Sequence, residues 1–183
     1  MNGEAFLLLV ISLAVLTIKP GPGMVAMVSR GLSDGFLPAF MIALGIATFH
    51  LVYFPLAALG FSFSGPHAGM ITLFLQLVGG IYILWMGVKG IRNLKNNPWD
   101  MRRRKDGNAA LLENYMTGLA INASNPFVIL YYIGLIPTIM DFSSFGAADI
   151  VVGTAATFMI IVAFLSVECA LAAQLREVLR SVN

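Results

Sequence analysis

The sequence predicts an all-α integral membrane protein with about five membrane-spanning helices, on two observations. Of its 183 residues, 58% are hydrophobic and 11% are charged, whereas soluble domains average about 45–50% and about 25%. The apolar residues form runs of roughly 20 residues, the length at which a helix crosses a bilayer, rather than the roughly ten-residue alternating strands of a membrane barrel. Residues 1–183 are therefore predicted to form a single transmembrane domain. The five predicted spans cover about residues 5–28, 37–61, 69–91, 114–137 and 149–173.

The first span is interrupted by Lys19-Pro20-Gly21-Pro22-Gly23 at roughly membrane depth. Proline removes an amide donor and clashes with the preceding turn, which costs about 3 kcal/mol in a helix interior. Lipid offers no water to the freed carbonyls, so such a break persists only where protein or a wet cavity surrounds it. Broken helices at this depth are the best sequence indication of a transport site. The alternative is a kink that serves packing alone.

Charged residues between the spans predict the topology. Arg30 and Asp34 are assigned to the loop after the first span. Most other basic residues crowd a loop at 92–113, which the positive-inside rule places in the cytoplasm. The run at 102–105 is interpreted as an orientation signal with some attraction for anionic lipid, and no aromatic or glycine pattern beside it indicates nucleic acid. With acidic residues alone near 141–149 and arginines in the tail, the N-terminus is predicted outside and the C-terminus inside.

The fourth span carries a second polar, proline-containing break, Asn122-Ala123-Ser124-Asn125-Pro126. It lies three spans after the first break, and an odd offset means that the two broken helices run in opposite senses, as in an inverted repeat. Asn122, Ser124 and Asn125 then offer donors and acceptors near the same midplane as the first break. The alternative is interhelical hydrogen bonding, at about 0.6 kcal/mol for each bond.

Further motifs accompany the two breaks in a fixed order. They are Ser29-Arg30-Gly31-Leu32, Gly45-Ile46-Ala47, Gly79-Gly80-Ile81-Tyr82-Ile83-Leu84-Trp85-Met86-Gly87 and Ala172-Ala173-Gln174-Leu175-Arg176. The ordered set resembles the LysE/RhtB family of amino-acid exporters along the whole chain. The resemblance implies an inner-membrane exporter of amino acids or similar small zwitterionic metabolites, driven by exchange for protons.

The chain departs from that family at four places. Lys19 stands where an uncharged residue is usual, and His50 where the second span usually carries an acid. The Asn-Pro-Lys of the family is Asn125-Pro126-Phe127 here. Members usually have a sixth span, which is not found before Asn183, so the second repeat is expected to be incomplete. These departures support an alternative function, a non-transporting accessory subunit of a larger membrane complex.

Three ionisable side chains, those of Lys19, His50 and Glu168, are assigned to the spans. Such groups pair or face water, because a charge at the centre of a span costs about 2.5–3.5 kcal/mol on insertion scales. Glu168 is a candidate partner for Lys19, or instead reaches toward the headgroups. His50 is the stronger candidate for proton coupling, because a free histidine changes charge near neutral pH. Cys169 and His50 form no catalytic motif, and no cluster has metal-ligand spacing, so neither an enzyme nor a cofactor or metal is expected.

The leading hypothesis places the substrate between the two breaks. Amide donors of Gly23, Met24 and Val25, where the second half-helix restarts, are expected to receive a carboxylate, since helix N-termini favour anions. Lys19 would strengthen this anion site, Asn122 or Asn125 would orient the ammonium group, and His50 or Glu168 would carry the proton. The expected partners are the substrate, protons, lipid, and either further copies of the chain or other membrane subunits. The substrate-binding residues predicted are Lys19, Pro20, Gly21, Pro22, Gly23, Met24, Val25, Asn122, Ser124, Asn125 and Pro126.

Overall fold

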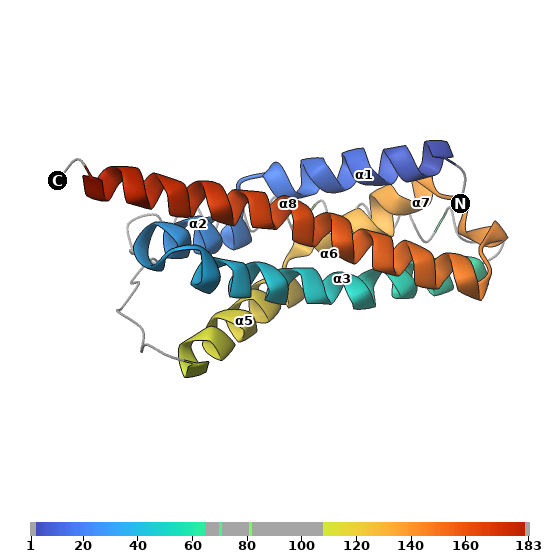
Figure 1. Ribbon diagram of the computed structural model, residues 1–183. Helices are drawn as coiled ribbons and strands as arrows, with labels where there is room; N and C mark the ends of the chain where they lie inside the picture. The colour runs from blue at the N-terminus through green and yellow to red at the C-terminus, as the bar shows by residue number, and fades with distance from the viewer. Residues whose placement is uncertain (1–2, 65–69, 71–80, 82–107, 182–183) are drawn as a thin grey trace.

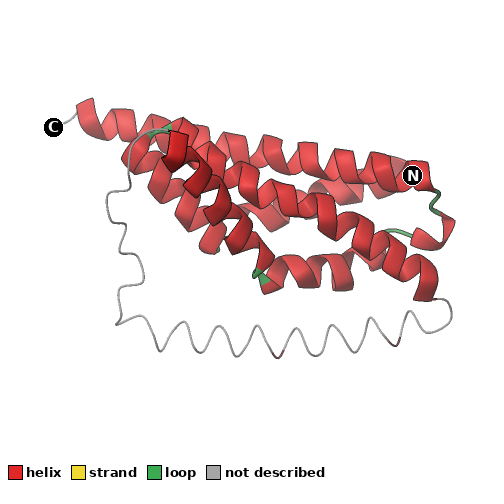
Figure 2. Cartoon of the chain, turned by 90° about the horizontal axis from the view of Figure 1, so that it is seen from below, coloured by secondary structure: helices red, strands yellow, loops and turns green. Residues whose placement is uncertain are grey.

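The described part of the protein is a bundle of membrane-length helices. The computed structural model describes residues 3–64, 70, 81 and 108–181, and within them every regular element is helical (Figure 2). Within these residues, two helices are long and apolar enough to cross a membrane, and two bent pairs raise the number to four if each pair is one span. The predicted all-α membrane class is confirmed. The elements are α1 (Gly3–Ile18), α2 (Pro22–Asp34), α3 (Phe36–Ser64), α5 (Asn108–Ala123), α6 (Pro126–Leu130), the π-helix η2 (Tyr131–Leu135), α7 (Ile136–Ile139), the 3₁₀ helix η3 (Phe142–Ser144) and α8 (Ala147–Ser181).

Both predicted breaks are present. The helices α1 and α2 meet at 64°, and the helices on either side of residues 124–125 meet at 52°. Figure 1 shows the two broken helices running in opposite directions: α1 and α2 run toward the end that holds the C-terminus, while α5, α6 and α7 run away from it. This is the relative orientation that the odd spacing of the breaks predicts.

The helix after the first break is longer than the sequence indicates. It continues past residue 28 to Asp34, so the assignment of Arg30 and Asp34 to a loop is wrong. The reason is local: Arg30 and Asp34 stand four residues apart and form an ion pair of 2.5 Å, which supports the last turn. Gly35 then ends the helix with a positive φ of 94°, a conformation that glycine adopts without strain.

Helices α3 and α5 cross in very close contact. A Cβ built on Gly45 would overlap the backbone carbonyl of Tyr115, and one on Gly118 would overlap that of Ile42. Small residues let helix backbones approach in this way when lipid supplies no hydrophobic drive. The contact fixes α5, and with it the second break, against the middle of α3.

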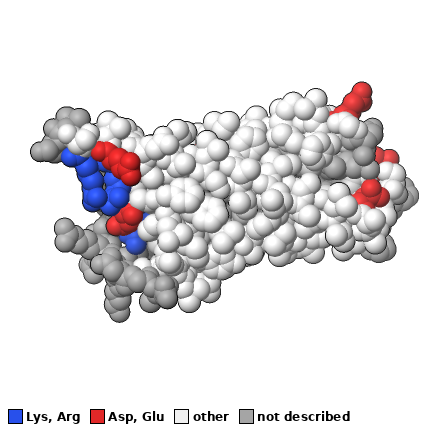
Figure 3. Space-filling view, viewed as in Figure 1, with Lys and Arg blue, Asp and Glu red and all other residues white. Residues whose placement is uncertain are grey.

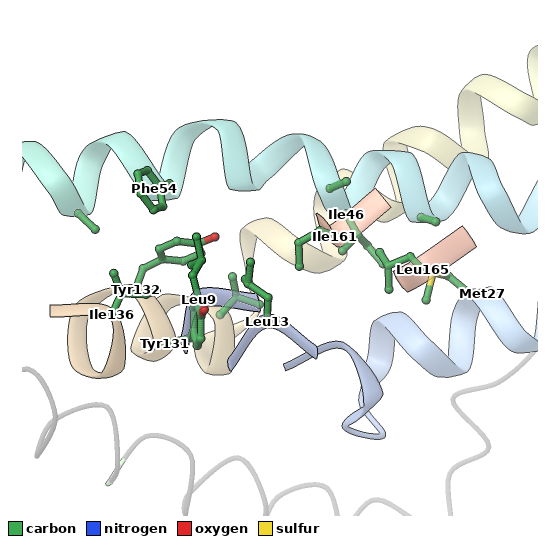
Figure 4. Packing of buried hydrophobic residues seen from close by; sticks show 14 of the residues in the cluster. Leu9, Leu13, Met27, Ile46, Phe54, Tyr131, Tyr132, Ile136, Ile161 and Leu165 are labelled. Carbon is green, nitrogen blue, oxygen red and sulfur yellow. The ribbon is translucent and has the colours of Figure 1, made fainter. Parts of the chain in front are cut away.

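The core lies along α3 and α8. The buried stripe of α8 recurs about every four residues, which places one face of this long helix against the bundle. Figure 4 shows Ile161 and Leu165 of this stripe near Ile46 of α3 and Met27 of α2. Farther along, Tyr132 and Ile136 lie below α3, which carries Phe54, so the core continues on both sides of the breaks.

Several sequence predictions fall outside the described residues. They are the third span at 69–91 apart from residues 70 and 81, most of the basic loop at 92–113, and the glycine-rich motif at 79–87 apart from residue 81. The fourth span begins in the structure at Asn108, earlier than the predicted residue 114. The last helix continues through the tail to Ser181, where Arg176 donates from Nε to the Ser33 carbonyl at 3.1 Å.

Candidate functional site

The first break leaves backbone donors without helical partners. Gly21 is the N-cap of α2, with extended backbone and no side-chain cap, and Pro22 occupies the first helical position. The Val25 N–H donates to the Gly21 carbonyl at 3.0 Å. Gly23 and Met24 lie within the first turn, whose N–H groups have no carbonyl one turn earlier in the helix. Two of the three predicted amide donors are therefore available at this end, and Val25 is not, because its donor closes the first turn.

The second break is tied down by its own side chains. Asn125 is the N-cap of α6, and its Oδ1 accepts from the Phe127 N–H at 3.1 Å. Asn122 is 1% exposed and donates from Nδ2 to the Ile46 carbonyl of α3 at 2.9 Å. The Tyr53 hydroxyl, also from α3, donates to the Ala123 carbonyl at 3.1 Å and lies 3.3 Å from that of Asn122. The interhelical bonding that the sequence left as an alternative for Asn122 is thus present.

A cavity of about 60 Å³ lies between the two breaks. It brings together residues of α1, α2, α3, α5, α6 and α8, so segments far apart in the sequence share one space. It is lined by Leu16, Thr17, Lys19, Gly21, Gly23, Met24, Met27, Ile46, His50, Asn122, Asn125, Val128, Ile161 and Leu165. Figure 4 shows four of these, Met27, Ile46, Ile161 and Leu165, converging between α2, α3 and α8.

His50 reaches this cavity from the middle of α3. It is 1% exposed, and its Nδ1 lies 2.7 Å from the hydroxyl of Tyr132, which is 2% exposed. Tyr132 belongs to the π-helix η2, a rare geometry that is frequent at functional sites. Because Nδ1 is held by a tyrosine, Nε2 is the imidazole atom left for another partner, and Tyr132 influences which nitrogen carries the proton.

Lys19 connects the two breaks without an acidic partner. Its Nζ lies over the ring of Phe127, the residue that follows Pro126, and a cation over an aromatic face is attracted by the ring quadrupole. Glu168 stands one turn past Leu165 on α8 and does not line the cavity. Among the described residues Lys19 and Glu168 form no ion pair, so the hypothesis that they are partners is wrong for this conformation. Oε2 of Glu168 is buried and has no hydrogen-bond partner among the described residues.

The cavity gathers some of the predicted site residues and omits others. It includes Lys19, Gly21, Gly23, Met24, Asn122, Asn125 and His50. It does not include Pro20, Pro22, Val25, Ser124, Pro126 or Glu168. Ser124 is exposed and donates from Oγ to the Ala120 carbonyl of its own helix at 2.8 Å. This local hydrogen bond accounts for a serine at the break without any contact to a substrate.

Sequence reasoning missed the aromatic partners of these residues. Tyr53, Phe127 and Tyr132 each hold a predicted site residue or the backbone of a break. The available signal was that a tyrosine inside an apolar span needs a partner for its hydroxyl. Tyr131 shows the same need, since its hydroxyl lies 2.8 Å from Ser12 Oγ of α1.

The comparisons with known proteins show the family to which the chain belongs. Residues 14–182 match the family described as LysE type translocator. The chain belongs to the LysE type translocator family. It is accordingly a multi-pass membrane protein of a translocator family, as its resemblance and its apolar helices predict.

The individual relatives of this LysE family member share only about a quarter of its residues over the matched part. An uncharacterized membrane protein of Synechocystis is 26% identical over 77% of this chain and 67% of its own length. The Bacillus subtilis protein named "Putative amino acid efflux protein YcgF" is 27% identical over 68% of this chain and 58% of its own length. A Pseudomonas aeruginosa protein named "Chemotactic transduction protein ChpE" is 28% identical over 63% of this chain and 55% of its own length. The matched part thus spans between about half and two thirds of these relatives, and no solved structure matches the chain.

Proposed function

We propose that this protein exports amino acids or similar small zwitterionic metabolites across the cell inner membrane in exchange for protons. The observation that carries the proposal is the cavity bounded by both breaks, which is where transporters with inverted repeats hold their substrates. The family and the name of the relative YcgF support the same direction. Substrate, proton coupling and compartment are parts of the proposal.

The carboxylate of the substrate binds at the N-terminus of α2. The Gly23 and Met24 N–H groups and the helix dipole favour an anion there, and Lys19 adds a positive charge to the same wall. Nδ2 of Asn122 is used by Ile46, which leaves its Oδ1 as the acceptor for the substrate ammonium group. The substrate therefore lies across the cavity, with its carboxylate at the first break and its ammonium group at the second.

His50 carries the exchanged proton in this proposal. It lines the same cavity and is held by Tyr132, so a change in its protonation alters the charge that the substrate meets. Each charge moved inward through a potential of 100 mV yields about 2.3 kcal/mol. Glu168 is a second candidate proton carrier, one turn farther along α8.

The proposed orientation in the membrane rests on the distribution of charge. On the face shown in Figure 3, Lys and Arg gather at the end that holds the C-terminus, while the opposite end shows Asp and Glu alone. The positive-inside rule then places the C-terminus in the cytoplasm and the N-terminus outside. Cysteine labelling from each side of intact cells tests this orientation directly.

The small volume of the cavity implies movement during transport. About 60 Å³ holds a few water molecules, and it is far below the about 300–1,000 Å³ of ordinary ligand pockets. Substrate binding therefore requires the helices around the cavity to separate. The described conformation corresponds to a closed step of the cycle.

The direct test uses purified protein in proteoliposomes with an imposed proton gradient. Amino-acid flux that depends on both the gradient and the protein is expected. Lys19→Ala and His50→Ala should each reduce it, and unchanged proton-linked flux in both variants would show that this mechanism is wrong. Glu168→Gln, compared with Glu177→Gln in the exposed tail, tests the second proton carrier.

The second candidate function is a non-transporting subunit of a larger membrane complex. The name of ChpE, a relative described as a chemotactic transduction protein, favours it. Isolation from the native membrane in mild detergent separates the two functions. A transporter is expected alone or with copies of itself, whereas stoichiometric unrelated chains would support the accessory role.

A further inference from the structure

The residues that line the cavity include a polar and an apolar group. The polar group includes residues of the two breaks and His50 of α3. The apolar group includes Met27 of α2 and Ile161 and Leu165 of α8, and Figure 4 shows these three side chains close together. We call these three residues the apolar wall. Met27 is 1% exposed, Ile161 is 0% and Leu165 is 3%, so all three side chains are packed against neighbouring residues in the described conformation.

We propose that the substrate is a neutral amino acid with an apolar side chain, of the size of valine, leucine or methionine. This inference rests on the proposed function and specifies its substrate class. With the carboxylate at Gly23 and Met24 and the ammonium group at Asn122, the side chain is directed to the wall of Met27, Ile161 and Leu165. Burying each apolar methylene there contributes about 0.8 kcal/mol.

The charges around the cavity disfavour cationic amino acids. No described lining residue is acidic, and Lys19 is among the lining residues. A lysine or arginine side chain would lose its hydration without gaining an anionic partner. It would also be repelled by the like charge of Lys19, which lines the same cavity.

The same wall disfavours amino acids with a second carboxylate. One carboxylate is accommodated by the amides at the α2 N-terminus. The side-chain carboxylate of glutamate or aspartate would be placed against Met27, Ile161 and Leu165, none of which donates a hydrogen bond. An unsatisfied buried charge is strongly unfavourable. The residues that line the cavity therefore disfavour both cationic and acidic amino acids.

Gly23 limits the size of the side chain. A Cβ at this position would lie 2.9 Å from Cδ1 of Ile46, the flexible end of a side chain that also lines the cavity. Alanine at position 23 is therefore tolerated by a small shift of Ile46, at the cost of cavity space. Larger substrates should lose more than smaller ones.

The test measures competition in proteoliposomes loaded with purified protein and radiolabelled leucine. Unlabelled leucine, valine and methionine are expected to inhibit leucine flux at least about tenfold more strongly than lysine, arginine, aspartate or glutamate. Inhibition by lysine or glutamate as strong as that by leucine would overturn the substrate class and leave export intact. Absence of flux for every amino acid under a proton gradient would instead refute the proposed function itself.

Two variants locate the side-chain wall. Gly23→Ala should weaken leucine inhibition more than alanine inhibition, whereas Gly60→Ala, at an exposed position with open space around it, should leave both unchanged. Leu165→Ala enlarges the cavity and should improve inhibition by phenylalanine relative to leucine, which keeps the test decisive if Gly23→Ala folds poorly. Equal effects on all substrates in both variants would contradict the assigned wall.

Discussion

Both breaks contain proline, but their backbone groups are satisfied differently. At the second break, the side chains of Asn125 and Tyr53 bond the Phe127 N–H and the Ala123 carbonyl, and Asn122 ties the break to the Ile46 carbonyl of α3. At the first break, Gly21 brings no side-chain cap to α2. The difference indicates two roles for one kind of interruption. The second break is anchored on α3, whereas the first break leaves N–H groups available, as the proposed carboxylate site requires.

This asymmetry also suggests which part moves. The second break is fastened to α3 by the Asn122–Ile46 hydrogen bond and by the close crossing at Gly118. The first break meets the second through the Lys19–Phe127 contact. A cation over a ring at an exposed site is worth about 0.5–1 kcal/mol, which is small enough to be broken and remade in a transport cycle. We therefore expect opening to begin at the first break.

The largest effect on stability is expected where the second break is fastened by backbone contact. Gly118→Ala places a Cβ onto the Ile42 carbonyl, and neither backbone can yield cheaply. The free energy of unfolding should fall by about 1–3 kcal/mol, measured by titration from mild detergent into a denaturing one. Gly60→Ala is the matched control, because no described residue lies within 4 Å of its added Cβ. Equal stability of the two variants would contradict the packed crossing.

Removal of the polar tie to α3 should have the next largest effect. Asn122→Leu keeps the number and branching of the side-chain heavy atoms but removes the side-chain donor to the Ile46 carbonyl. A loss of about 1–2 kcal/mol in the free energy of unfolding is expected. Ser124→Ala is the control from the same break, since its exposed hydroxyl bonds only within its own helix. The anchoring role would be wrong if both variants unfolded at the same denaturant concentration.

The cap of the second break should contribute less. Asn125→Ala removes the acceptor for the Phe127 N–H and should cost about 1 kcal/mol, whereas Asn125→Ser retains a capping oxygen and should recover most of it. Flux measurements on the same variants separate capping from substrate binding. If Asn125 serves only as a cap, the KM for leucine should stay unchanged in both variants. A KM raised equally in both would assign Asn125 to the ammonium group of the substrate.

The sequence predicted the breaks well and their bonding poorly, for a physical reason. Proline and glycine restrict the local backbone, so residues 20–23 and 125–126 identify the interruptions from composition alone. Which residue satisfies an interruption depends on neighbours remote in sequence, such as Tyr53 and Ile46 for the second break. The extension of α2 to Asp34 was also missed. Charged residues at the end of an apolar run were assigned to a loop, although Arg30 and Asp34 are four residues apart and their ion pair supports a helical turn.

The smallest expected effect on stability accompanies a large effect on transport. Gly21 has extended backbone, with φ of −151°, and a Cβ there would make an ordinary contact of 3.9 Å with the Lys19 carbonyl. Gly21→Asn therefore fits without strain and supplies the cap that the first break lacks, by accepting from the Gly23 or Met24 N–H. The free energy of unfolding should change by only a few tenths of a kcal/mol, while leucine flux should fall sharply, because the side chain occupies the donors assigned to the substrate carboxylate. Gly21→Ala adds a Cβ without an acceptor and should retain flux. If Gly21→Asn transported as well as Gly21→Ala, the amides of the first break would not be the carboxylate site, and the two breaks would differ in bonding without differing in function.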